Sequence, residues 1–263
     1  ESIHGKNYYV SYRVKNVLLI LDEYTPFKDV LYNALVSRLP ADHKIDLWFH
    51  QYNENLFNNI VRESYGMYNK YLIMNYSNEV LAASLSKINP KKLLLLDFGS
   101  FDKDGLSYVC QDFDRGFYDA LDQAKHDFKK YKKIVFLFDK RHKHPQSSKD
   151  YFIRFCADNN FEFEIINSFT PDTPVEEGTL YIIIKQTDVV EVIKRSKADK
   201  LTVGKQFGII GYNNNPFYEV IENGIAAISI DWEEMGNLAA DFVITGNPIT
   251  RYLPTKIIKR GSY

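Results

Sequence analysis

The sequence predicts an α/β protein built from two lobes, each with a doubly wound parallel sheet. Short apolar runs alternate along the chain with segments whose apolar residues recur every three or four positions, as in alternating strands and helices. The apolar runs are continuous, which is typical of parallel strands covered on both faces. The 263 residues suffice for two lobes of about 100–150 residues each.

The first lobe is predicted from four units in which a strand precedes a helix or a polar loop. The strands are expected at residues 17–21, 45–49, 71–74 and 92–96. A first helix is expected after Thr25, which can cap it, with Pro26 at its first position. Further helices are expected at about 53–63 and 78–87.

The second lobe repeats this pattern. Helices are expected at residues 112–129, 147–158 and 187–195, and strands at 134–138, 161–166, 180–184, 207–210 and 226–230. Asp231 is expected to cap a last helix, whose positive first turn holds Glu233 and Glu234. Residues 249–263 are predicted to return as an extended strand.

Composition excludes several classes of protein. The formal net charge of −1 argues against nucleic-acid binding by this chain itself. No run approaches the ~18 apolar residues of a membrane span, and the first ten residues lack the apolar core of a signal peptide. Cys110 and Cys156 lack metal-ligand spacing, so we expect reduced thiols in a cytoplasmic protein.

Polar side chains follow several of the predicted strands. Asp22 and Tyr24 come after the first strand, and Asn75 and Asp97 after the third and fourth. In the second lobe, residues 212–216 form a loop with three successive asparagines, a residue type that tolerates left-handed backbone and both donates and accepts hydrogen bonds. Small ligands of open α/β sheets bind at this edge, so the sequence predicts a ligand site there.

Four short motifs carry a family resemblance. GIIGYNN at 208–214 with Pro216 is similar to a strand and loop I-S-V-V-G-Y/F-D-D-x-P, and VCQD at 109–112 with Gly116 to a crossover V-x-x-D-x-x-x-G. ISID at 228–231, with MG at 235–236 and AA at 239–240, is similar to a helix entry T-x-x-x-Q-P/D-x-x-x-x-G-x-x-A. LPT at 253–255, followed by KRGS at 259–262, is similar to a closing segment L-P-x-x-L-V-x-R-x-S. In order and spacing, the chain resembles the effector-binding domain of LacI/GalR-type transcription regulators.

This resemblance implies a periplasmic-binding-protein-like type I fold, with two lobes joined by a multi-stranded hinge. It places residues 16–111 plus 231–248 in an N-terminal lobe and 112–230 plus 249–263 in a C-terminal lobe. It implies a small sugar or sugar derivative bound in the interlobe cleft, no cofactor, and a homodimer formed through the helix at 27–39, with the helix at 78–87 as a further candidate.

The N-terminus carries a second resemblance. GKNYYV at residues 5–10 is similar to the β-turn and strand that end the winged helix-turn-helix of GntR-type regulators; the alternative is a plain turn and strand. Residues 1–15 are therefore predicted to be a wing remnant and linker, as in regulators of the arabinose-repressor type. Operator DNA would be bound by a domain absent from this chain.

The resemblance also indicates which residues contact the ligand. The candidates are Asp22, Tyr24, Phe27, Asn75, Tyr76, Asp97, Arg141, Lys149, Lys185, Gln186, Asn213, Asp231 and Trp232. For the polar ones, the alternatives are helix caps, loop formation or a solvated basic loop. Phe27, Tyr76, Phe98 and Trp232 are candidate rings for stacking on a sugar, although most aromatic residues are expected to be core.

The second lobe departs from the family pattern. Lys149 replaces an arginine, for which Arg141 is a candidate substitute; Lys185 and Gln186 replace an Asn-Asp pair, and Asn213 an aspartate. Because these changes remove negative charge, they suggest a ligand with a carboxylate or phosphate, or one making fewer acceptor-only contacts.

Other functions find less support in the sequence. The common dinucleotide, P-loop, nucleophile-elbow and zinc-protease motifs are absent, so no enzyme is predicted. His142 and His144 lack a clear third metal ligand. The alternative from another class is an extracytoplasmic sugar-binding receptor of a transport or signalling system, which shares the fold.

Overall fold

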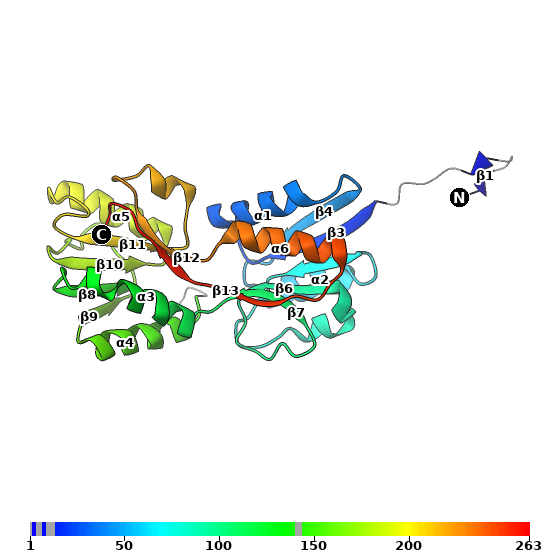
Figure 1. Cartoon of the computed structure of the whole chain (residues 1–263), viewed down its shortest axis with the longest axis horizontal. Coiled ribbons are helices and arrows are strands. Elements are labelled where there is room, and N and C mark those ends of the chain that lie inside the picture. Colours follow the sequence, from blue (N-terminus) through cyan, green and yellow to red (C-terminus); the bar gives the residue numbers. More distant parts are fainter. Residues whose placement is uncertain (1, 4–6, 9–13, 140–143) are drawn as a thin grey trace. The chain divides into compact units, whose positions relative to one another are not determined.

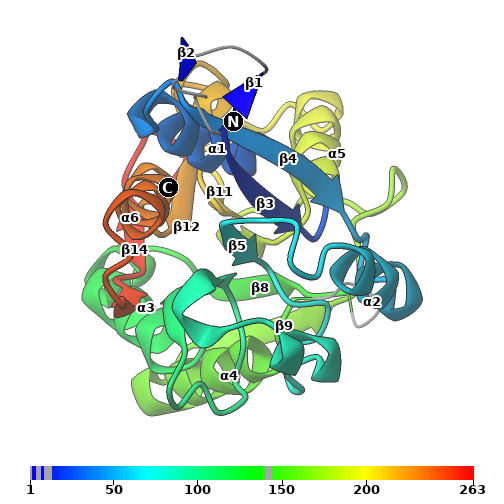
Figure 2. The same cartoon turned by 90° about the vertical axis from the view of Figure 1, so that its right-hand side faces the viewer.

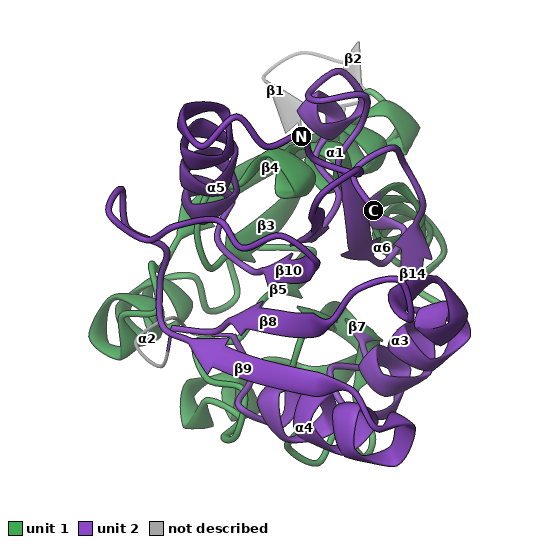
Figure 3. Cartoon of the chain, turned by 90° about the vertical axis from the view of Figure 1, so that its left-hand side faces the viewer, with its two compact units in different colours: residues 1–110, 233–251 green, residues 111–232, 252–263 purple. Residues whose placement is uncertain are grey.

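The computed structural model describes residues 2–3, 7–8, 14–139 and 144–263. Two compact units make up the chain: residues 1–110 with 233–251, and residues 111–232 with 252–263 (Figures 1 and 3). The chain passes from one unit to the other after Cys110, after Trp232 and after Arg251. Two parallel-sheet α/β units joined by these three crossings confirm the predicted fold class. Most of the GKNYYV segment lies outside the described residues. The described part of it, β2 (Asn7–Tyr8), pairs antiparallel with β1 (Ser2–Ile3).

The first unit is organised around a six-stranded sheet. Its order is β13 (Thr250–Leu253), β7 (Ser107–Gln111), β6 (Leu93–Asp97), β5 (Lys70–Ile73), β3 (Lys15–Leu21) and β4 (His43–Phe49). The pairs from β4 to β7 are parallel. Five successive buried residues in β3 and all five in β6 account for the continuous apolar runs of the sequence. β7 was not expected as a strand.

Helices cover both faces of this sheet. On one face, Phe57 of α2 (Glu54–Glu63) packs in a cluster with Leu18 and Ile20 of β3. α1 (Pro26–Arg38) and α6 (Trp232–Thr245) lie against each other (Figure 2). Their backbones approach so closely at Gly236 that a Cβ there would lie 2.3 Å from the carbonyl oxygen of Leu31. The small residue is therefore required by helix packing.

The predicted helix at residues 78–87 is wrong. That segment is irregular up to the short 3₁₀ helix η1 (Ala83–Lys87), and a second one, η2 (Pro90–Lys92), follows it. The Asn75 amide donates to the carbonyls of Ser77 (2.7 Å) and Val80 (2.8 Å) and accepts from the Ala82 N–H (3.2 Å). A side chain thus bonds the backbone groups that a helix would have paired internally. This segment offers no helix for the predicted dimer contact.

The second unit has the same strand order as the first. Its sheet runs β14 (Lys256–Ile258), β12 (Ala226–Ser229), β11 (Gly208–Tyr212), β10 (Thr179–Ile183), β8 (Lys133–Leu137) and β9 (Glu162–Ile166). All pairs from β9 to β12 are parallel, and β14 is antiparallel to β12. The predicted return strand at 249–263 is therefore split between β13 in one sheet and β14 in the other.

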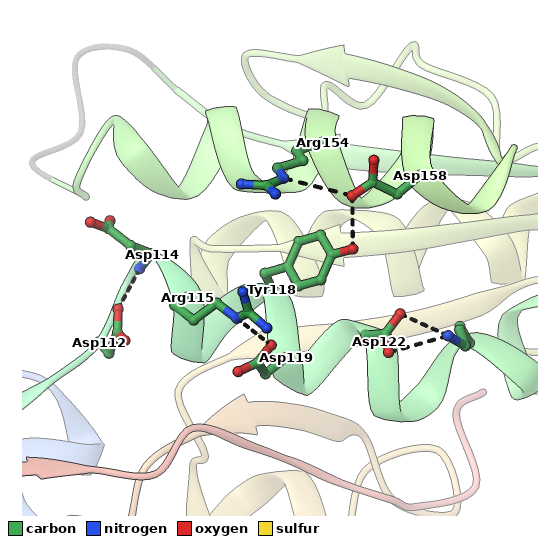
Figure 4. Close-up of polar contacts among 9 residues, drawn as sticks. Asp112, Asp114, Arg115, Tyr118, Asp119, Asp122, Arg154 and Asp158 are labelled. Carbon is green, nitrogen blue, oxygen red and sulfur yellow. Dashed lines mark hydrogen bonds and ion pairs between the residues drawn. The ribbon is translucent and has the colours of Figure 1, made fainter.

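Three helices flank this sheet: α3 (Arg115–Phe128), α4 (Ser147–Asn159) and α5 (Gln186–Ala198). α3 and α4 are linked on their exposed side, where the Tyr118 hydroxyl donates to Asp158 (2.8 Å), which also pairs with Arg154 (Figure 4). Each such surface contact contributes only about 0.2–1 kcal/mol. Cys110 and Cys156 are buried free thiols, as expected, and burial raises the pKa of each to about 12.

Candidate ligand-binding site

The strand order locates the candidate site within each unit. In both sheets the order reverses at one point, between β3 and β5 in the first unit and between β8 and β10 in the second. Ligands of open α/β sheets bind outside the carboxyl ends of the strands at such a point. The residues that follow these strands are Asp22 and Asn75 in the first unit, and Asp139 and Lys185 in the second.

Asp22 is at the centre of a buried polar network. Its side chain forms an ion pair with Lys28 of α1, and both residues are almost fully buried, at 1% and 3% exposure. The other carboxylate oxygen accepts a hydrogen bond from the Tyr52 hydroxyl (2.6 Å), and the Glu23 N–H donates to the first (2.6 Å). Both carboxylate oxygens of Asp22 thus accept hydrogen bonds from the protein itself.

The loop after β4 carries a buried histidine beside this network. His50 Nδ1 accepts a hydrogen bond from the Tyr52 N–H (3.1 Å), which places the proton of the neutral ring on Nε2. Burial lowers the pKa of His50 to about 4, against the opposing charge of Asp22. The ring is therefore neutral at physiological pH.

Aromatic rings gather around the same edge of the first sheet. Tyr52 stacks on Phe98, with ring centroids 6.4 Å apart, and Tyr76 packs against Phe57 at 5.4 Å. The Tyr76 hydroxyl donates to Glu54 (2.9 Å). Tyr24 is 70% exposed. Phe27, another predicted stacking ring, lies in the first turn of α1 and is partly buried.

Asn75 and Asp97 are both buried at strand ends but differ in their roles. The amide of Asn75 is hydrogen-bonded to three backbone groups of the loop that follows it. Asp97 ends β6 with φ of 73°, a left-handed conformation that costs energy for a residue with a side chain. Such strain at a strand end is characteristic of functional sites, so Asp97 stays a candidate contact.

In the second unit, Lys185 reaches Asp139. The two side chains form an ion pair of 2.6 Å, with Asp139 only 5% exposed. Burial raises the pKa of the neighbouring Asp188, partly offset by the charge of Lys185. The positive charge of Lys185 is thus balanced within the protein, which removes one support for an anionic ligand.

The three asparagines after β11 have three different roles. Asn215 accepts a hydrogen bond from the Phe217 N–H (2.9 Å) and caps the short turn η3 (Pro216–Glu219), while Asn214 accepts one from Arg260 (2.9 Å). Asn213 has φ of 62°, and its N–H donates to the Ile228 carbonyl (2.8 Å). Within the part of the chain that the structure describes, its buried Oδ1 has no hydrogen-bond partner.

Gln186, the first residue of α5, complements Asn213. Its Nε2 is likewise buried without a hydrogen-bond partner among the described residues. Gln186 follows β10 and Asn213 follows β11, and these strands are hydrogen-bonded neighbours. A buried unpaired donor and a buried unpaired acceptor at adjacent strand ends are the groups that a bound hydroxyl would satisfy.

The remaining predicted residues are placed as follows. Arg141 and His142 lie outside the described residues. Lys149 is partly exposed in the first turn of α4, and Asp231 is exposed directly before α6. Trp232 is 4% exposed at the start of that helix. The described residues contain no group of three or more His, Cys, Asp or Glu side chains that could hold a metal ion.

Lys28, Tyr52 and Asp139 were missed by the sequence analysis. Lys28 lies three residues before buried Leu31 and seven before buried Leu35, so a lysine on the apolar face of α1 was a readable signal. Asp139 follows an apolar strand just as Asp22 and Asp97 do. No comparable local pattern marks Tyr52.

The architecture defines the class of fold. Two α/β units of identical strand order, joined by three crossings, form the periplasmic-binding-protein-like type I fold, which is the fold of the effector-binding domains of LacI-family regulators. No family model matches the sequence, and no curated protein is detectably similar to it in sequence. No helix within the described residues has the length and apolar character needed to cross a bilayer.

Solved structures with this fold include named regulators. The trehalose repressor from Escherichia coli superposes with a TM-score of 0.76 at 13% identity, covering 93% of this chain and 100% of that one. A LacI family transcriptional regulator from Lactobacillus casei with bound glucose gives 0.73 at 14%, covering 95% and 100%. One from Enterococcus faecium with bound ribose gives 0.72 at 14%, covering 94% and 98%.

Proposed function

We propose that this chain is the effector-binding part of a LacI-type transcription regulator and that residues at its strand ends bind a small sugar. Binding changes the affinity of an attached winged helix-turn-helix for operator DNA. The observation that carries the proposal is the fold, which covers almost the whole of regulators that hold glucose and ribose. The buried unpaired atoms of Asn213 and Gln186 supply the matching local chemistry.

The proposed contacts are narrower than the full set of sequence candidates. Gln186, Asn213 and Asp97 are proposed to hydrogen-bond the hydroxyls of the sugar. Asp22 and Asn75 are proposed to support the site, because their polar atoms are already bonded within the protein. Because the ion pairs of Lys28 and Lys185 balance both charges, a neutral sugar fits these groups better than a phosphorylated one.

The mechanism is a shift in a conformational equilibrium. The sugar stabilises the conformation that binds it more tightly, and it shifts the equilibrium only by its difference in affinity for the two states. In a homodimer, this shift alters the spacing of two DNA readers and hence the affinity for an operator.

A sugar-binding receptor is the second candidate. One structural neighbour, described as a periplasmic binding protein/LacI transcriptional regulator from Alkaliphilus metalliredigens, is complexed with D-xylulofuranose and has a TM-score of 0.72 at 12% identity. The fold alone therefore serves both classes, and DNA binding is the property that separates them.

Calorimetry and operator binding test the proposal together. The purified chain is titrated with glucose, ribose, sucrose, trehalose and glucose 6-phosphate, and the chain with its upstream segment is tested for sugar-dependent binding to DNA from its own promoter region. Saturable binding of a neutral sugar that changes DNA affinity supports the regulator. Sugar binding without any DNA binding supports the receptor, and the absence of sugar binding overturns both.

A further inference from the structure

The loop after β4 carries a tyrosine ring over the carboxyl edge of the first sheet. β4 is the outermost strand of that sheet, and β3 and β5 separate it from β6. Tyr52, after β4, stacks on Phe98, after β6, with the two ring planes 29° apart. Since the strands that carry them are not neighbours, the two rings meet above the ends of β3 and β5. That is the point at which the strand order reverses.

The backbone that directs Tyr52 there is strained. Gln51 and Tyr52 have φ of 49° and 54°, a left-handed conformation that residues with side chains adopt at an energetic cost. Hydrogen bonds hold the loop. The His50 N–H donates to the Leu21 carbonyl (3.0 Å), the Gln51 N–H to the Asp22 carbonyl (2.6 Å), the Tyr52 N–H to His50 Nδ1 (3.1 Å) and the Asn53 N–H to the His50 carbonyl (2.8 Å). Strained backbone that is stabilised by surrounding hydrogen bonds is found at ligand-binding and active sites, where it fixes the orientation of a side chain.

The Tyr52 hydroxyl is already committed to the protein. It donates to Asp22, which is ion-paired with Lys28, so its proton is not available to a ligand. Tyr52 as a residue is partly exposed, and its ring is backed by Phe98, which is only 5% exposed. What Tyr52 offers a ligand is therefore an apolar ring face.

We infer that Tyr52 is the stacking surface for the C–H face of a cyclic sugar, that Phe98 supports the Tyr52 ring from behind, and that Asp22 and Lys28 position Tyr52 without contacting the ligand. This inference rests on the proposed function and makes it more specific. A pyranose or furanose presents a flat C–H face that an aromatic ring covers well. An acyclic polyol with the same hydroxyls does not, so the site selects ring-form sugars.

Glycine is the appropriate replacement for Tyr52, because it adopts positive φ without strain and so preserves the loop. Tyr68 provides a matched control in the same unit: it is also partly buried, and its hydroxyl also donates to an aspartate, Asp46 (3.0 Å), but it precedes β5 at the opposite end of the strand. The Tyr52→Gly and Tyr68→Ala variants thus remove one tyrosine each, at opposite edges of the sheet.

The experiment is calorimetric titration of the wild type and both variants with glucose and ribose, and with sorbitol and ribitol as acyclic counterparts. The wild type is expected to prefer a cyclic sugar, and Tyr52→Gly to weaken its binding by about tenfold while Tyr68→Ala leaves it within about twofold. If Tyr52→Gly binds as the wild type does, or polyols bind as tightly as ring sugars, the inference is overturned while the proposed function stands. If the wild type binds none of the sugars, both fail.

A second variant tests the positioning role of Asp22. Tyr52→Phe keeps the ring but removes the hydroxyl that anchors it to Asp22. If Asp22 acts only through Tyr52, binding weakens by a factor of about three, and the melting temperature of the free chain identifies any general loss of folding. If Asp22 itself contacts the sugar, Tyr52→Phe frees a carboxylate oxygen and binding is unchanged or tighter, which contradicts the inference.

Discussion

Substitutions of Asn213 distinguish two roles for this residue, ligand binding and loop formation. Its Oδ1 is buried without a partner among the described residues, while its backbone is fixed at φ of 62° by the hydrogen bond to Ile228. Replacing Asn213 by glycine removes the amide but suits the backbone, because glycine adopts positive φ freely. Replacing it by alanine removes the amide and also places a Cβ in the left-handed region.

The two substitutions therefore have different expected magnitudes. Leaving a ligand hydroxyl unpaired in a buried site costs ~1–3 kcal/mol, so both variants should bind the sugar roughly 5- to 150-fold more weakly. The left-handed backbone adds ~1 kcal/mol of destabilisation for alanine, which lowers the melting temperature by roughly 2–4 °C in a chain of this size. Asn213→Gly should melt close to the wild type.

Calorimetry for affinity and thermal melting of the unliganded chain are the assays. Asn160 is a matched control, because it is an exposed asparagine with φ of 55° at the C-terminus of α4 in the same unit. Asn160→Ala should show the same loss of melting temperature with unchanged affinity. If Asn213→Gly retains full affinity, or unfolds the chain, Asn213 is a loop-forming residue and the reasoning is refuted.

Three further predictions concern the packing of the first unit. Because burial lowers the pKa of His50 from 6.5 to about 4, the unfolded chain takes up a proton first on acidification, and the free energy of unfolding should fall by ~3 kcal/mol between pH 6.5 and pH 4. Denaturant melts should show this slope, and His50→Asn should lose it; an unchanged slope would assign it to other groups. Gly236→Ala should cost ~1–3 kcal/mol in the same melts, because its Cβ would collide with the Leu31 carbonyl, and a neutral effect would contradict the close approach of α1 and α6. Lys28→Met should cost ~3–5 kcal/mol by leaving the Asp22 carboxylate buried and unpaired, and the double variant Lys28→Met/Asp22→Leu should recover part of that loss; strict additivity would argue against the ion pair.

The order of most elements was predictable because buried parallel strands have an unmistakable composition. β3 is recognised from five successive apolar residues and β6 from four, and α1 from Pro26 and its spaced apolar positions. The helix expected at 78–87 is absent for a reason that the spacing of apolar residues does not reveal. A buried asparagine, Asn75, competes for the backbone of that segment, and its burial depends on the fold of the whole sheet.

The sequence predicted which polar residues follow the strands, but not which of them are bonded within the protein and which can contact a ligand. That polar groups follow the strands is visible in the sequence, and Asn213 and Gln186 were named from it. That Asp22 and Lys185 are bonded to Lys28 and Asp139 is a matter of three-dimensional pairing, which a linear pattern does not encode. Tyr52 was missed because its role depends on a left-handed loop that carries its ring to another strand.

Hydrogen exchange with and without a sugar tests the central claim most directly. If Tyr52, Asp97, Gln186 and Asn213 contact the ligand, the sugar that binds in calorimetry should slow amide exchange at residues 50–53 and 97–99 of the first unit and at residues 185–187 and 212–215 of the second. The outer helices α3 and α4 should exchange at the same rate in both conditions. Protection confined to the strand ends of one unit, or absent from both, would contradict the account.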